Sequence, residues 1–214
     1  PTATTIDIAG TPTDVAYVIT GNQRAMVCVN WTTGAVIWSS PGPNGAGGGG
    51  ARWGITSVAN QGGTDVVYHC TEIGRVVARV AATGALFGGW TTNPIVLAND
   101  ASDVINTYNP EDNLLYFGDL PASGNRDIYA VDAATGAFVW TLSSTGGLQG
   151  LTIWEANSAD TAYIPTPEGF SSHVAYEGGF VYFNSRSQAP ADGHQYPSDG
   201  IYYKVNAASG ALVK

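Results

Sequence analysis

The sequence predicts an all-β fold, a β-propeller built of about four four-stranded blades, and three observations lead to this prediction. A turn pattern that ends in Thr-Gly or Ser-Gly occurs four times, with its glycine at positions 34, 84, 136 and 210. The intervals between these glycines are 50, 52 and 74 residues. Alternating apolar residues flank the turns, and no stretch shows sustained helical periodicity. Repeats of this length with short strands are typical of propeller blades, because a single hairpin cannot bury its apolar face alone.

The first two units are each predicted to hold four short strands. In the first unit, approximately residues 1–40, the strands are expected at 4–9, 16–20, 25–30 and 35–39. In the second, approximately residues 51–92, they are expected at 53–59, 65–71, 75–80 and 85–90. The segment 41–50 between the units is rich in Pro and Gly and is predicted to form a surface loop.

The remaining two units complete a single predicted propeller domain over residues 1–214. The third, approximately 93–142, is expected to hold strands at 94–99, 114–118, 127–131 and 137–142, with an Asp- and Asn-rich stretch after the first. The fourth, approximately 150–214, has two alternatives for its first strand, 151–155 and 172–176. Its later strands are expected at 180–184, 201–205 and 211–213. The longer last interval between turn glycines indicates an insertion in this unit.

Composition limits the kinds of partner. Hydrophobic residues make up 44% of the chain and charged residues 12%, which is typical of a globular protein. A net charge of -9, with only eight Lys and Arg residues, disfavours binding to nucleic acid or to an anionic membrane. No apolar run is long enough to span a membrane. The acidic balance, the low lysine content and the abundance of Thr, Ser, Gly and Ala favour a secreted or cell-surface location.

The cysteines and histidines show no metal-ligand or catalytic spacing. Cys28 and Cys70 are far apart in the sequence, and either a disulfide or two buried thiols fits their strand positions. His69 and His173 lie in strand-like segments, where a packed or solvent-facing role is expected rather than a ligand role. No catalytic residue and no metal ligand is therefore predicted.

One copy of the turn pattern resembles a known repeat at all of its defining positions. Ala130, Asp132, Thr135, Gly136 and Trp140 are similar to the tryptophan-docking repeat of the quinoprotein-type (PQQ-like) β-propellers, Ala-x-Asp-x-x-Thr-Gly-x-x-x-Trp. Segments 115–118 and 181–184 also resemble the strand that precedes this repeat. The resemblance therefore covers essentially the whole chain and implies the propeller fold.

The other three copies depart from the repeat. The copy at 28–38 has Cys28 and Asn30 at the first two positions, the copy at 78–90 has Val80 in place of the acidic residue, and the last copy has Lys214 in place of the tryptophan. In the family the tryptophan packs against the neighbouring blade. The resemblance thus implies structural docking roles for Trp38, Trp90, Trp140, Gly34, Gly84, Gly136 and Gly210.

The resemblance implies a scaffold rather than a chemistry, because the repeat is structural in enzymes and non-enzymes alike. The family includes alcohol and sugar dehydrogenases that carry pyrroloquinoline quinone with calcium, and outer-membrane assembly factors that carry no cofactor. This chain lacks the adjacent cysteine pair that many of the alcohol dehydrogenases place against the quinone. No cofactor is predicted, with calcium or pyrroloquinoline quinone as the alternative. Family propellers usually have more than four blades, so the chain forms either a small ring or part of a larger one.

The long segment 185–200 supplies the candidate binding residues. It joins the second and third strands of the fourth unit, and such connections emerge on the same face of a propeller as the connections between blades. Segments 41–50 and 119–126 should gather there too, and a rigid scaffold commonly binds its partners through such loops. The candidate contacts are Arg186, Asp192, His194 and Tyr196. The alternative is that the segment is a tolerated insertion.

Two further motifs bear on metal binding and on modification. Asp100, Asp103, Glu111 and Asp112 group hard oxygen donors that suit calcium, but their spacing matches no twelve-residue calcium loop and favours solvated turn residues. The triplet 30–32 is an N-glycosylation acceptor sequence, which makes Asn30 a candidate glycosylation site in a secreted protein. Alternatively, Asn30 replaces the turn aspartate of the docking repeat.

The function predicted from the sequence is that of a non-enzymatic binding or assembly scaffold, secreted or on the cell surface, which binds a protein or carbohydrate partner through its loop face. The first alternative is a quinoprotein-like dehydrogenase, or a fragment of one, with pyrroloquinoline quinone and calcium. The second is a self-assembling structural subunit whose copies complete the ring, because unpaired blade faces are large apolar surfaces.

Overall fold

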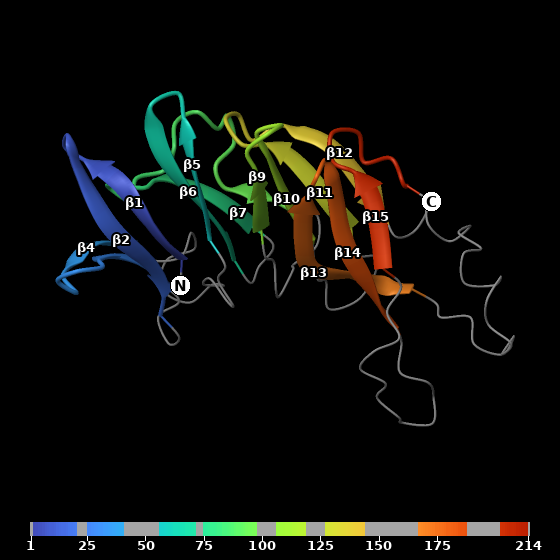
Figure 1. The fold of residues 1–214 in the computed structure, drawn as a ribbon, viewed down its shortest axis with the longest axis horizontal. Coiled ribbons are helices and arrows are strands. Elements are labelled where there is room, and N and C mark those ends of the chain that lie inside the picture. Colours follow the sequence, from blue (N-terminus) through green and yellow to red (C-terminus); the bar gives the residue numbers. More distant parts are fainter. Residues whose placement is uncertain are drawn as a thin grey trace, which may run out of the picture.

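The chain forms four small antiparallel β-sheets in a computed structural model, which confirms the all-β prediction (Figure 1). The structure describes residues 2–20, 25–40, 56–71, 75–97, 106–118, 127–143, 167–187 and 202–213. Every regular element in these ranges is a strand. The described residues include no helix that is long and apolar enough to cross a membrane.

Strands follow one another in sequence order within each sheet. The first sheet contains β1 (Thr2–Ile8), β2 (Thr11–Ile19), β3 (Met26–Asn30) and β4 (Val36–Ser40). The second contains β5 (Ser57–Gln61), β6 (Thr64–Thr71), β7 (Arg75–Val80) and β8 (Ile95–Val96). The third contains β9 (Asn106–Asn109), β10 (Leu114–Gly118), β11 (Asp127–Asp132) and β12 (Phe138–Ser143). The fourth contains β13 (Pro167–Glu177), β14 (Phe180–Ser187) and β15 (Tyr202–Asn206).

The last strand of the second sheet differs from its prediction. Residues 85–90 contribute only one isolated bridge, between Arg79 and Leu86, and β8 pairs with β7 in their place. The strand expected at 94–99 therefore closes the second sheet rather than opening the third. The side chain of Asn93 explains the gap. The Phe87 N–H donates to the Ala78 carbonyl at 2.9 Å, but the Ala78 N–H donates to Asn93 Oδ1 at 3.3 Å rather than to a strand carbonyl.

The third and fourth sheets also differ from their predictions. The third sheet opens with β9, inside the Asp- and Asn-rich stretch, because Asn106 and Asn109 are buried and make side-chain hydrogen bonds there. In the fourth sheet, residues 172–176 lie within β13, while the competing segment 151–155 lies outside the described residues. Residues 211–213 form only a bridge between Val205 and Leu212.

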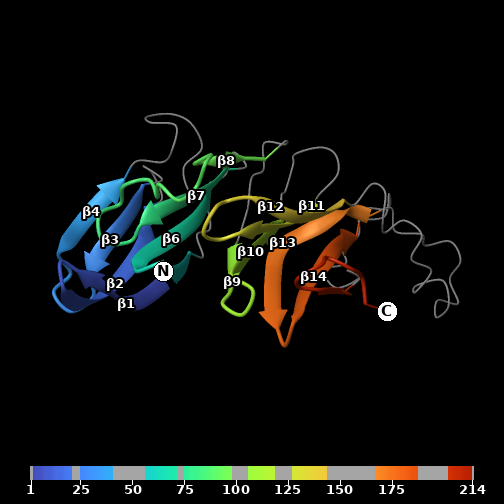
Figure 2. The same ribbon diagram turned by 90° about the horizontal axis from the view of Figure 1, so that it is seen from above.

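The sheets are arranged in a row that curves into an arc, with the first and fourth sheets at opposite ends (Figures 1 and 2). The first strands of neighbouring sheets approach each other, β5 with β9 and β9 with β13. Described residues of the first and fourth sheets lie far apart in both views. The described sheets thus form an open arc.

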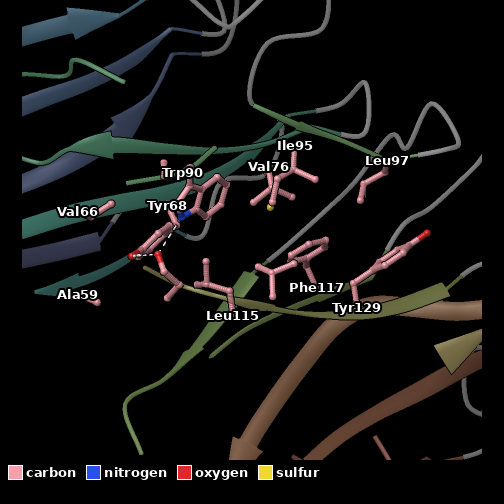
Figure 3. Packing of buried hydrophobic residues seen from close by; sticks show 14 residues of the cluster. Ala59, Val66, Tyr68, Val76, Trp90, Ile95, Leu97, Leu115, Phe117 and Tyr129 are labelled. Atoms are coloured by element: carbon pink, nitrogen blue, oxygen red, sulfur yellow. Dashed lines mark hydrogen bonds between the residues drawn. The ribbon is translucent and has the colours of Figure 1, made fainter. Parts of the chain in front are cut away.

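The hydrophobic core is divided into three clusters, each between two consecutive sheets. Tyr17 and Trp38 of the first sheet pack with Val67 and Ala81 of the second. A second cluster joins the second and third sheets, and a third joins the third and fourth. Figure 3 shows the middle cluster, where Tyr68 and Trp90 lie opposite Leu115. Face-to-face packing of successive sheets is what a propeller requires.

Candidate functional site

A tight corner follows the third strand of each sheet, and in the first, third and fourth sheets a side chain of the corner holds it. In the third sheet, Asp132 Oδ1 accepts hydrogen bonds from the backbone N–H of Ala134 and of Thr135, at 3.0 and 2.8 Å. The N–H of Gly136 donates to the Asp132 carbonyl at 2.8 Å. Gly136 has φ +73°, a conformation that side chains disfavour. The corner therefore needs its glycine, whereas the acceptor side chain is an addition, since the second sheet forms the same turn with the Gly84 N–H on the Val80 carbonyl at 2.8 Å.

The corner of the first sheet uses Asn30 in the same way. Asn30 Oδ1 accepts from the backbone N–H of Thr32 and of Thr33, at 3.0 and 2.8 Å. This geometry supports the interpretation that Asn30 replaces the turn aspartate. Its use as a glycosylation acceptor stays a prediction.

Each tryptophan of the repeat reaches forward to the corner of the next sheet. The indole Nε1 of Trp38 donates to the carbonyl of Ala81 at 2.8 Å. At the two later contacts Trp90 donates to Ala133, and Trp140 donates to Ala207, each at 2.8 Å. A buried indole N–H needs an acceptor, and these carbonyls supply it.

A tyrosine that sequence reasoning missed donates to the same carbonyl in each contact. The hydroxyl of Tyr17 lies 3.1 Å from the Ala81 oxygen, that of Tyr68 lies 2.9 Å from the Ala133 oxygen, and that of Tyr116 lies 3.2 Å from the Ala207 oxygen. Burial raises the pKa of all three phenols, to about 12 for Tyr116. The strand register was the available signal. Each tyrosine lies two residues after the residue that pairs, on the neighbouring strand, with the first residue of the corner.

The second sheet places two polar side chains in its contact with the first. Arg79 Nε donates to His69 Nε2 at 3.3 Å, and Arg79 Nη1 donates to the Gly84 carbonyl at 2.8 Å. Burial, and secondarily the charge of Arg79, lower the pKa of His69 to about 3. His69 Nδ1 has no acceptor among the described residues, so the imidazole is neutral and packed, as expected from the sequence. The pair acts structurally at this position.

The candidate loop contacts fall largely outside the description. Asp192, His194 and Tyr196 lie outside the described residues. Arg186 lies in β14, but its side chain is among those that the structure does not describe. These four residues stay predictions.

The acidic residues expected to be solvated are only partly described. Asp100 and Asp103 lie outside the described residues. Glu111 accepts a hydrogen bond from the hydroxyl of Tyr176 in the fourth sheet, and Asp112 accepts one from Asn109. These two carboxylates thus take part in contacts within and between sheets.

The potential metal ligands and the two thiols of the described residues are dispersed. No group of three or more His, Cys, Asp or Glu residues that could hold a metal occurs within them. Cys28 and Cys70 are buried free thiols in different sheets, so they form no adjacent pair. Burial raises the pKa of Cys28 to about 11 and that of Cys70 to about 12, as expected for packed thiols.

Comparison with solved structures finds quinoprotein dehydrogenases. A quinohemoprotein alcohol dehydrogenase from Pseudomonas putida HK5 is 20% identical with a TM-score of 0.62, over 94% of this chain and 32% of that chain. A europium-containing methanol dehydrogenase is 13% identical with a TM-score of 0.62, over 94% and 39%. A quinohemoprotein alcohol dehydrogenase from Comamonas testosteroni is 18% identical with a TM-score of 0.59, over 95% and 33%. A scan against protein-family models and a search of curated sequences gave no match.

These structures define the fold of the chain. It is that of the PQQ-like β-propellers, as the docking repeat predicted. The chain spans about a third of the length of the solved structures it matches, and its four sheets fit part of a propeller. At this level of identity the likeness establishes the fold and not the activity.

Proposed function

We propose that the chain is a non-enzymatic binding or assembly scaffold, a PQQ-like propeller segment that folds as one domain over residues 1–214 and is secreted or on the cell surface. The observation that carries the proposal is that the two ends of the sheets differ in the length of the connections between strands. At one end lie the tight turns, such as those at Gly62 and Gly178. At the other end lie the strand ends from which every long connection departs.

The antiparallel register supports this asymmetry. β4 ends at Ser40, which pairs with Met26 at the start of β3, so the connection to the second sheet leaves from the same end as the connection from β2 to β3. The same pairing applies to β12 and β11 in the third sheet, where Ser143 pairs with Asp127. Segments 41–55, 119–126, 144–166 and 188–201 therefore all begin at one face. A scaffold with one face of long connections suits recognition of a protein or carbohydrate.

The buried polar side chains support a structural rather than a catalytic role. The phenols and indoles at the sheet contacts donate to backbone carbonyls of the next sheet, and Arg79 donates to a backbone carbonyl and to His69. The phenols and indoles thus join neighbouring sheets, and Arg79 joins two parts of the second sheet.

Two measurements test the proposed function. The purified chain is incubated with pyrroloquinoline quinone and calcium, and we expect neither a bound chromophore nor dye-linked alcohol oxidation; either result would favour the dehydrogenase alternative. The chain is also screened on arrays of glycans and of secreted proteins. A triple variant, Asp192→Ala with His194→Ala and Tyr196→Ala, should lose any binding found. Glu177→Ala, exposed at the opposite end of the sheets, should retain it.

A further inference from the structure

The contact between the first and second sheets holds two buried polar atoms that have no hydrogen-bond partner among the described residues. They are Thr56 Oγ1 and His69 Nδ1, on side chains of residues that are 3% and 1% exposed. The backbone of Thr56 is bonded to the first sheet, since its carbonyl accepts from Thr2 Oγ1 at 2.8 Å. A buried polar group without a partner costs free energy, and native proteins rarely contain one. Two such atoms in one contact therefore need an explanation.

The strand register brings the two side chains together. Ser57 pairs with Tyr68 in the antiparallel β5–β6 ladder, so the same register places Thr56 opposite His69. Opposite residues of an antiparallel pair point to the same face of the sheet. This face is turned towards the first sheet, because Val67, two residues before His69, packs in the cluster between the two sheets.

The hydrogen bond from Arg79 determines which nitrogen of His69 carries the proton. Arg79 Nε donates to His69 Nε2 at 3.3 Å, and a guanidinium can only donate, so Nε2 is unprotonated. The neutral imidazole then carries its proton on Nδ1, which is a donor that needs an acceptor. The hydroxyl of Thr56 beside it can donate and accept.

The contact between the second and third sheets has an amide at the equivalent position. Asn106 pairs with Phe117, the residue after a docking tyrosine, just as Thr56 lies opposite His69. Asn106 Nδ2 donates to the carbonyl of Tyr68, the docking tyrosine of the preceding sheet, at 3.3 Å. An asparagine side chain thus spans this contact directly.

Threonine is too short to make the same bond. The hydroxyl of Thr56 is one bond closer to the backbone than the amide nitrogen of an asparagine. The equivalent acceptor in the first sheet is the carbonyl of Tyr17, and Thr56 Oγ1 makes no hydrogen bond to it. A carbonyl oxygen has two lone pairs, so Tyr17 can accept a further bond as Tyr68 does.

The contact between the third and fourth sheets replaces both polar side chains by apolar ones. Val174 stands at the position of Thr56, and its partner Phe183 stands at that of His69. Both are buried. The hydroxyl and the imidazole are therefore present together in one contact and replaced together in another, which indicates that they serve one purpose.

We propose that a water molecule is bound between the first and second sheets, where it accepts from His69 Nδ1, bonds to Thr56 Oγ1 and donates to the Tyr17 carbonyl. Three partners are typical of a buried water. The water takes the place of the Asn106 amide nitrogen. An ion fits less well, because the imidazole N–H would repel a cation and the carbonyl would repel an anion.

NMR of the full chain and a crystal structure test the site. We expect the His69 ring proton on Nδ1, with a cross-peak to water whose sign is that of a long-lived bound molecule. Electron density should show one water oxygen at about 2.7 to 3.2 Å from each of the three atoms. A proton on Nε2 instead, or a protein atom bonded to Nδ1, would overturn the proposal.

Variants of Thr56 separate a bound water from an unpaired hydroxyl. Thr56→Val removes the hydroxyl at constant shape and should lower the folding equilibrium constant about tenfold, the factor that about 1.4 kcal/mol produces. Thr56→Ser should keep the water cross-peak. Thr11→Val, the same change at an exposed threonine of β2, is the matched control and should alter the constant no more than about twofold. A Thr56→Val chain as stable as wild type, or more stable, would contradict the bridge.

Thr56→Asn recreates the contact that Asn106 makes. The amide should displace the water, so the cross-peak to the His69 ring proton should disappear while the chain remains about as stable as wild type. A cross-peak that persists in this variant would count against the assigned position. The triple loop variant should leave every signal of this site unchanged, because the site lies between sheets and does not depend on the proposed binding function.

Discussion

Trp140 lies directly over Gly210, and a Cβ built on that glycine would come 2.7 Å from Cδ2 of the indole. Trp38 over Gly84 and Trp90 over Gly136 repeat the arrangement. Glycine thus has two roles at these corners, since it adopts the positive φ and leaves space for the ring of the preceding sheet. The docking contact depends on both.

The double role of glycine predicts unequal costs for the same substitution. Gly136→Ala adds a methyl group against the Trp90 ring, at a position where φ is already +73°. Gly34→Ala meets the same backbone strain but no neighbouring atom. We expect Gly34→Ala to lower the free energy of unfolding by about 1 to 2 kcal/mol, and Gly136→Ala by clearly more.

Urea denaturation followed by tryptophan fluorescence measures both values. Equal costs for the two variants would show that the indole does not occupy the space over Gly136.

The shared carbonyl predicts that Tyr17 and Trp38 are coupled. Tyr17→Phe leaves the Ala81 carbonyl bonded to the indole, and Trp38→Phe leaves it bonded to the phenol. The double variant leaves a buried carbonyl without either donor, which costs about 1 to 3 kcal/mol beyond the sum of the single effects. A double-mutant cycle on the free energy of unfolding measures this term. Simple additivity would mean that the two donors do not share one acceptor.

His69 predicts a loss of stability in acid. Its pKa is about 3 in the folded chain, against an ordinary value of 6.5. Between these values the unfolded chain binds a proton that the folded chain does not, so stability falls as pH decreases from 6.5 towards 3. His69→Gln keeps an acceptor for Arg79 but cannot titrate there. As the pH falls through this range, the free energy of unfolding of the variant should rise relative to that of wild type by up to about 1.4 kcal/mol per pH unit. Parallel pH profiles would exclude the buried neutral histidine.

The two thiols predict a loss of stability in alkali. Burial raises the pKa of Cys28 to about 11 and that of Cys70 to about 12, above the ordinary value of 9.0. Above pH 9 the unfolded chain releases protons that the folded chain retains. The free energy of unfolding therefore falls as the pH rises from 9 towards 12. Cys28→Ala with Cys70→Ala should show a flatter alkaline profile. At pH 8 a thiol reagent should modify wild type only as fast as it unfolds, and rapid modification of the native chain would contradict the burial.

The sequence was most informative where local chemistry determines structure. The corners at Asp132 and Asn30 were predictable because a short acceptor side chain and a following glycine define such turns by themselves. Trp140 was predictable because it belongs to the same repeat. Tyr68 and Tyr116 were missed because, taken singly, a tyrosine in a strand has no distinctive pattern. Their role depends on the register between strands and on the next sheet.

Two strands show where apolar patterning fails. β9 buries Asn106 and Asn109, whose amides are bonded, so the hydrophobic alternation that identifies a strand is absent. In the second sheet, the side chain of Asn93 takes the place of a strand carbonyl as the acceptor of the Ala78 N–H, which no periodicity could indicate. The candidate loop residues lie in segments without repeat chemistry. Their role therefore stays a prediction that the binding screen tests.

Hydrogen exchange of the indole N–H groups, followed residue by residue by NMR, tests the central claim most directly. If successive sheets dock through the repeat, the indole protons of Trp38, Trp90 and Trp140 should exchange only through global or near-global unfolding, because each is bonded at 2.8 Å to a carbonyl of the next sheet. The backbone amides of the corners they cover should be protected with them. Immediate exchange of all three indole protons in the folded chain would contradict the account.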